Sequence, residues 1–119
     1  MTSCRPVVLV LEDEALISLD LEVALVEGGY MVVLSSSCAE AARFLADNRP
    51  SAAVLDIRLR DGECVAVAKA LVAQGVPFVV HSGAHLPNED QVFKLGSLVR
   101  KPNDAQAVVA ALRSALIRP

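Results

Sequence analysis

The sequence predicts an α/β domain in which a five-stranded parallel sheet carries helices on both faces. Two observations predict this architecture. Short apolar runs alternate along the whole chain with segments whose apolar residues recur at helical spacing, as in a parallel sheet with crossover helices. Hydrophobic residues make up 54% of the 119 positions and aromatic residues only 3%, so the core must consist of Val, Leu, Ile and Ala, as in strands buried on both faces.

The strands are expected where short apolar runs end in polar or turn residues. These runs are Val7–Leu11, Tyr30–Leu34, Ala52–Ile57, Phe78–Ser82 and Leu98–Arg100.

The helices are expected between the strands. In the first, apolar residues recur at helical spacing until a Gly-Gly pair ends the pattern. That stripe consists of Leu16, Leu19, Val23 and Val26. Three further helices are expected. Ser36 or Ser37 caps one that runs to about Asn48, a second covers Glu63–Gln74 before Gly75, and the last covers Asp104–Ile117 with Val108, Leu112 and Leu116 on one face. The segment Gly83–Gly96 is the exception, because only Asn88–Leu95 could be helical there. We therefore expect the fourth helix to be short or disordered.

Length, charge and cysteine content limit the class of protein. The length suits one domain over 1–119, and a formal net charge of −3 argues against direct nucleic-acid binding, which needs a basic face. No apolar run reaches the roughly 18 residues of a membrane span. Cys4, Cys38 and Cys64 form no CxxC pair, and the N-terminus carries no secretory signal. We expect a cytoplasmic protein whose thiols are reduced and pack as small apolar groups.

Polar side chains fall at the carboxyl ends of four predicted strands. Glu12 and Asp13 follow the first strand, Asp56 lies at the end of the third, Ser82 ends the fourth and Lys101 follows the fifth. In a strand order 2-1-3-4-5 the first and third strands flank the point where strand order reverses, which is where open α/β sheets bind ligands. Three converging carboxylates repel each other unless a cation neutralises them, and Mg²⁺ suits such oxygen ligands.

This arrangement predicts phosphoryl chemistry on Asp56. A carboxylate can attack phosphorus to give an aspartyl phosphate, while Lys101 supplies a cation and the Ser82 hydroxyl a hydrogen bond to the phosphoryl oxygens. Each feature alone has an ordinary explanation, as a helix cap, a turn residue or a Lys-Pro pair at the surface. Their joint order on one repeating architecture is what indicates a site. His81 and His85 lack the clustered spacing of metal ligands, so we expect packing or surface roles for both.

Four segments resemble the receiver domain of two-component response regulators, and the resemblance covers essentially the whole chain. Val8–Glu14 resembles the acidic-pair strand, Ala53–Leu59 the phosphoacceptor strand, Val79–Gly83 the Ser/Thr strand, and Val99–Pro102 the Lys-Pro turn. The resemblance implies the flavodoxin-like, doubly wound fold. Because the last predicted helix ends two residues before the last position, we expect a stand-alone receiver or, as the alternative, a domain excised from a protein with an output module.

The resemblance further implies a function and its site. Asp56 accepts a phosphoryl group from the phosphohistidine of a sensor histidine kinase or phosphotransfer protein, and the domain signals in a phosphorelay by protein–protein contact with an unknown downstream target. Asp13 and Asp56 bind Mg²⁺ directly, Glu12 acts through water, and the backbone carbonyl of Arg58 completes the protein's ligands. Such a domain is not an enzyme in the ordinary sense, because it catalyses only its own phosphorylation and slow dephosphorylation.

The chain departs from the family pattern in places. Leu98 stands where most receivers carry a switch aromatic, and the loop Leu59–Gly62 is short and lacks the usual Pro. Gly75–Gly83 resembles a subfamily with a Pro-Phe…Thr-Gly-Tyr signature that serves kinases of the HWE and related classes, although Ala84 replaces the Tyr.

Other functions fit the residues less well. A haloacid-dehalogenase-like phosphatase needs a second Asp two residues after the nucleophile, and Arg58 stands there. A nucleotide or flavin binder needs a Gly-rich loop after the first strand, where the acidic run Glu12–Glu14 would repel phosphate. A phosphorylation-independent, receiver-like interaction module stays open as the alternative.

Overall fold

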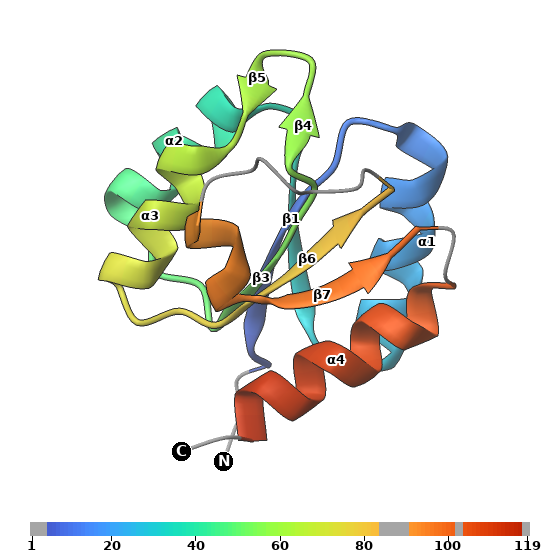
Figure 1. The fold of residues 1–119 in the computed structure, drawn as a ribbon. Coiled ribbons are helices and arrows are strands. Elements are labelled where there is room, and N and C mark those ends of the chain that lie inside the picture. Colours follow the sequence, from blue (N-terminus) through green and yellow to red (C-terminus); the bar gives the residue numbers. More distant parts are fainter. Residues whose placement is uncertain (1–4, 84–90, 102–103, 118–119) are drawn as a thin grey trace.

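The computed structural model describes residues 5–83, 91–101 and 104–117, and its main feature is one parallel sheet (Figure 1). Neighbouring strands follow the order β2-β1-β3-β6-β7, and all four pairings are parallel. Without the small β4–β5 hairpin described below, this is the predicted order 2-1-3-4-5, which is confirmed. The strands are β1 (Val7–Leu11), β2 (Met31–Ser35), β3 (Ala52–Leu55), β6 (Phe78–Ser82) and β7 (Ser97–Arg100).

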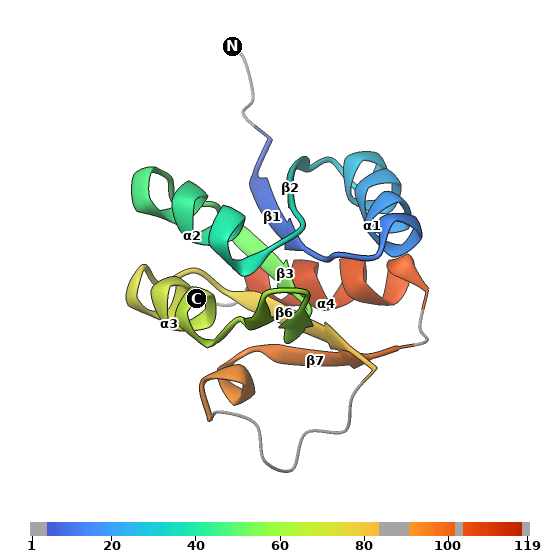
Figure 2. The same cartoon turned by 90° about the horizontal axis from the view of Figure 1, so that it is seen from above.

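Helices cover both faces of the sheet, as Figure 2 shows. Helices α2 (Cys38–Asp47) and α3 (Val65–Ala73) lie on one face, and α1 (Ala15–Glu27) and α4 (Ala105–Ile117) lie on the other. The doubly wound α/β class is thereby confirmed. None of the helices in the described part of the chain is long and apolar enough to cross a bilayer.

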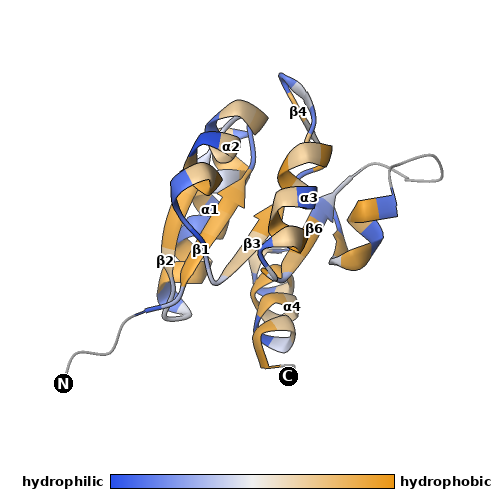
Figure 3. Cartoon of the chain, turned by 90° about the vertical axis from the view of Figure 1, so that its left-hand side faces the viewer, coloured by the Kyte–Doolittle hydropathy of each residue, from blue (hydrophilic) through white to orange (hydrophobic). Residues whose placement is uncertain are grey.

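The three central strands β1, β3 and β6 supply the core, and Figure 3 shows how apolar they are. Consecutive strand residues point to opposite faces, so Leu9 and Leu55 pack beneath α2 and α3 whereas Val8 and Val54 pack beneath α1 and α4. All four are essentially inaccessible to solvent. Continuous aliphatic runs are therefore required here, because both faces of each strand are covered.

Several predicted helix ends are confirmed by their caps. The Ser37 hydroxyl accepts a hydrogen bond from the Glu40 amide at 3.1 Å at the start of α2, and Asp104 does the same for the Ala107 amide at 3.1 Å at the start of α4. Such side chains satisfy amides that have no partner within the first turn. Gly75 follows α3 with a φ of 70°, a conformation that favours glycine.

The predicted first helix is confirmed as α1, but the apolar residues that recur at helical spacing in it do not form its buried face. Its four stripe residues are exposed, the extremes being Leu16 at 79% and Val26 at 45%. The side chains that pack on the sheet are instead Leu21, Ala24 and Leu25. The reason is that apolar residues surround this helix, so helical spacing fits more than one stripe. Only docking on the sheet selects between them.

The predicted third helix starts two residues too early. Glu63 belongs to a short antiparallel hairpin of β4 (Arg58–Leu59) and β5 (Gly62–Glu63), and α3 begins at Val65. Gly62 adopts a φ of 122°, which other residues rarely adopt. In Figure 1 this β4–β5 hairpin stands beyond the end of β3, beside α2.

In the fourth connection, residues 84–90 lie outside the described part. Gln91–Leu95 forms a single 3₁₀ segment, η1, which agrees with a short fourth helix. Val92 and Phe93 anchor it in the core under α3. Gly96 then lies so close to Phe78 that an added Cβ would sit 2.5 Å from the ring.

The prediction of three reduced thiols is also wrong, because Cys38 and Cys64 form a disulfide with their Cα atoms 5.5 Å apart. The two cysteines are separated by 26 positions in sequence and meet only because α2 and α3 pack side by side, which residue spacing does not reveal. Cys4 lies outside the described residues.

Candidate functional site

The acidic residues converge where β1 and β3 end. Leu11 and Leu55 are register partners in the two adjacent strands, so Glu12 and Asp56 follow at the same level, and the Asp56 amide donates to the Leu11 carbonyl at 2.9 Å. Carboxylate oxygens of Glu12, Asp13 and Asp56 all lie within 4.8 Å of one another. The predicted convergence of three carboxylates is confirmed.

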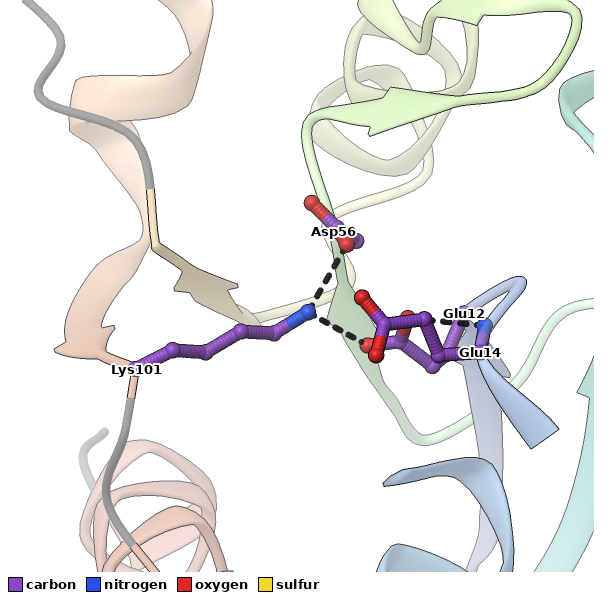
Figure 4. A network of polar contacts seen from close by, with 4 residues as sticks. All are labelled: Glu12, Glu14, Asp56 and Lys101. Carbon is purple, nitrogen blue, oxygen red and sulfur yellow. Dashed lines mark hydrogen bonds and ion pairs between the residues drawn. The ribbon is translucent and has the colours of Figure 1, made fainter. Parts of the chain in front are cut away.

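Lys101 follows the edge strand β7, and its side chain extends towards the ends of β3 and β1, where it meets Asp56 and Glu12 (Figure 4). Its backbone amide donates to the Ser82 carbonyl at 3.0 Å, which extends the β6–β7 pairing by one residue. Its ammonium nitrogen Nζ lies 2.9 Å from Glu12 Oε1 and 2.9 Å from Asp56 Oδ2. One cation therefore joins the ends of β1, β3 and β7.

The backbone holds Glu12 in an unexpected position. Its amide donates to the Ser35 carbonyl of β2 at 3.0 Å, and its carboxylate accepts from the Glu14 amide at 3.2 Å. The Glu12 side chain is only 1% exposed, against 13% for Asp56. The receiver resemblance implies a role for Glu12 through water, which stays a prediction, and the direct ion pair of Glu12 with Lys101 was not predicted.

Burial and charge act against each other in this site. Burial raises the pKa of Glu12 above its usual range, and the hydrogen bonds from Lys101 and Glu14 oppose this only in part. For Lys101, burial alone lowers the pKa, but hydrogen bonds to Glu12 and Asp56 outweigh it and the pKa is raised. Burial thus favours the protonated carboxyl at Glu12, whereas the two carboxylates favour the charged ammonium at Lys101.

The donor set suits a hard divalent cation. Clustered carboxylate oxygens are the ligands that Mg²⁺ prefers, and Asp13 and Asp56 keep partial exposure while Glu12 is buried. Arg58 lies two residues beyond Asp56 in β4, and the role of its backbone carbonyl as a ligand stays a prediction.

Ser82 and His81 end β6 beside this cluster. Ser82 is 2% exposed and shares the end of the sheet with Lys101, and its predicted bond to a phosphoryl group stays a prediction. His81 is 4% exposed, which agrees with a packing role, and His85 lies outside the described residues. Together with Lys101, His81 borders a groove of about 530 Å³ between α1 and α4.

Comparisons with known proteins identify the fold. No protein-family model matches the sequence, and no curated protein does. Among solved structures, a response regulator receiver protein from Sinorhizobium medicae is 24% identical with a TM-score of 0.81, covering 94% of each chain. A CheY-like response regulator receiver domain protein from Methanospirillum hungatei is 22% identical with a TM-score of 0.82, covering 95% of this chain and 94% of that one.

A third structure is similar in sequence as well. SdrG from Sphingomonas melonis is 32% identical with a TM-score of 0.80, and the match covers 98% of this chain and all of SdrG. The protein thus has the CheY-like receiver fold of response regulators. It belongs to the same family as SdrG.

Proposed function

We propose that the protein is a response-regulator receiver that accepts a phosphoryl group on Asp56 from a histidine kinase or phosphotransfer protein. The observation that carries the proposal is the position of the Asp56 carboxylate, which shares the sheet edge with Glu12 and Asp13 and lies 2.9 Å from the Lys101 ammonium. The carboxylate proposed as the nucleophile thus shares the sheet edge with the carboxylates proposed to hold a cation and with the Lys101 ammonium, which supports the proposal.

The chain's own residues would act as follows. An Asp56 oxygen attacks phosphorus, a P–O bond forms as the P–N bond to the donor imidazole breaks, and the imidazole keeps the electron pair and takes up a proton. Lys101, already within 2.9 Å of Asp56 Oδ2 and Glu12 Oε1, compensates negative charge on the phosphoryl oxygens. Glu12, Asp13, Asp56 and the Arg58 carbonyl would hold Mg²⁺, which shields the carboxylates from the incoming charge.

Phosphorylation is tested with acetyl phosphate and Mg²⁺ as the donor mixture, followed by intact mass. Wild type should gain one phosphoryl group that hydroxylamine removes, because an acyl phosphate is labile to that nucleophile. Asp56→Asn should gain none, since the nearly isosteric amide lacks the nucleophilic oxygen. Asp47→Asn, which changes an exposed carboxylate at the end of α2, is the matched control and should behave as wild type. Undiminished labelling of Asp56→Asn would refute the assignment.

We further propose that the donor belongs to the HWE or related kinase classes and that the protein works in the cytoplasm through protein contacts rather than as an enzyme. Pro77 and Phe78 at the start of β6, with Ser82 and Gly83 at its end, support the kinase class through the signature they resemble. Faster phosphotransfer from a purified HWE-class kinase than from a kinase of another class is the expected result.

The alternative, a phosphorylation-independent module, predicts a partner that binds wild type and Asp56→Asn equally well.

A further inference from the structure

The disulfide lies at the N-termini of two adjacent helices. Cys38 is the first residue of α2, and Cys64 directly precedes α3. Cys64 is 1% exposed, whereas Cys38 is partly open to solvent. Of the two sulfurs, that of Cys38 is therefore the one that a dissolved thiolate can attack when the bond is closed and that can attack a dissolved disulfide when the bond is open.

A second contact ties the same two elements together. The Asp61 carboxylate, in the turn between β4 and β5, accepts hydrogen bonds from the Cys38 amide at 2.9 Å and the Ala39 amide at 3.1 Å. These bonds lower the pKa of Asp61, which is fully exposed. Asp61 thus caps α2 from outside that helix, and the β4–β5 hairpin is held against α2 at its tip.

The far end of this hairpin is continuous with the acidic cluster. Asp56 directly precedes Ile57, whose carbonyl accepts from the Cys64 amide at 3.0 Å. The chain between these two points includes Arg58, whose backbone carbonyl belongs to the proposed Mg²⁺ site. The hydrogen bond between Cys64 and Ile57 closes the segment that follows Asp56. The disulfide holds Cys64, the last residue of that segment, against α2.

We propose that Cys38 and Cys64 are a reversible redox pair that controls Mg²⁺ binding and phosphorylation at Asp56 through the β4–β5 hairpin. This inference rests on the proposed function. With the disulfide closed, the hairpin is held by a covalent bond and by the Asp61 contacts. With it open, the hairpin tip and α2 keep the solvent-exposed Asp61 bonds and a long contact of 3.6 Å from the Cys38 sulfur to the Gly62 carbonyl, and exposed bonds of this kind are weak. The closed form presents its backbone ligands already ordered, which reduces the entropy lost on binding.

A low-molecular-weight disulfide of the glutathione class can oxidise the two cysteines. The Cys38 thiolate attacks one sulfur of that disulfide, forming a mixed disulfide and expelling one thiolate. The Cys64 thiolate then attacks the Cys38 sulfur and expels the second. Two protein thiols are oxidised to one disulfide, one small disulfide is reduced to two thiols, and the two cysteine protons pass to the expelled thiolates. In a cytoplasmic protein such a bond is more often transient and redox-sensing than structural.

Three measurements on oxidised and reduced wild type test the inference. Thiol titration after equilibration in glutathione buffers should show reversible loss of two thiols. Amide hydrogen exchange of the metal-free protein should be slower at residues 58–64 when oxidised. Mg²⁺ affinity and the initial rate of phosphorylation by acetyl phosphate should both rise about fivefold or more on oxidation, the low end of common couplings between two sites.

The variant Cys38→Ser changes the partly exposed cysteine and should show the reduced-state values under both conditions. Cys4→Ser, which leaves the pair intact, should respond to redox state as wild type does. Equal Mg²⁺ affinity and equal phosphorylation of both redox states would overturn the inference and leave the proposed function standing. Failure to phosphorylate Asp56 in either state would overturn the proposed function and the coupling with it, even where hydrogen exchange still responds.

Discussion

At the scale of single residues, the site depends on one ammonium group that bridges two carboxylates. Replacing Lys101 by Met should lower the unfolding free energy of the metal-free chain by about 1–3 kcal/mol, because Glu12 and Asp56 would lose the cation 2.9 Å from each. Mg²⁺ should recover more stability in this variant than in wild type, since it supplies the missing positive charge. Urea denaturation with and without Mg²⁺ measures both effects. Lys69→Met, at an exposed position of α3, is the control and should change little.

His81 gives the same edge of the sheet a dependence on pH. Burial, together with the nearby charge of Lys101, holds its pKa below the usual 6.5. The unfolded chain therefore binds more protons than the folded chain below that value. The contribution of a neutral His81 to the unfolding free energy is therefore complete above pH 6.5. It is lost as the pH falls from 6.5 towards the lowered pKa of the folded protein.

Substitution separates this contribution from other acid effects. Neither ring nitrogen of His81 has a hydrogen-bond partner among the described residues, so His81→Leu should raise the unfolding free energy by about 1 kcal/mol at neutral pH. The variant should also lose less stability than wild type between pH 7.5 and 5.5. Denaturation curves at the two pH values measure this, and identical losses in both proteins would contradict a buried, neutral imidazole.

Residue type and strand position were sufficient to predict which side chains gather at the site. Asp56, Lys101 and the acidic pair after β1 were placed at the sheet edge because parallel strands end there together. Sequence could not decide which acidic neighbour faces inward. That choice depends on how the chain turns after Leu11, where the Glu12 amide bonds to Ser35 of a strand distant in sequence.

At the scale of elements, α1 shows what helical spacing leaves undecided. Leu25 is fully buried and Leu16 is 79% exposed, although both are Leu on the same helix. Leu25→Ala should therefore cost about 2–5 kcal/mol of unfolding free energy, because it leaves a cavity under the sheet, while Leu16→Ala should stay within about 0.5 kcal/mol of wild type. Thermal or urea denaturation of the two variants provides the comparison. A larger loss of unfolding free energy for Leu16→Ala than for Leu25→Ala would contradict the packing of Leu25, and not Leu16, against the sheet.

Short elements escaped prediction for a different reason. The strands β4 and β5 contain two residues each, too few to display an alternating pattern. The hairpin depends instead on the positive φ of Gly62 and on the distant bonds of Asp61 to α2. Longer elements such as β6 were predicted with correct bounds, because five buried residues between turn residues leave little choice.

At the scale of the whole molecule, the disulfide is a consequence of topology. The sheet order places α2 and α3 side by side on one face, and only then do two cysteines separated by 26 positions meet. A closed loop of that length restricts the unfolded chain, so reduction should lower the unfolding free energy by about 2–4 kcal/mol. Urea denaturation of wild type with and without a thiol reductant measures the difference. Cys38→Ser should unfold at one midpoint under both conditions, close to that of reduced wild type. If reductant leaves the wild-type midpoint unchanged, the bond does not contribute to folding in solution.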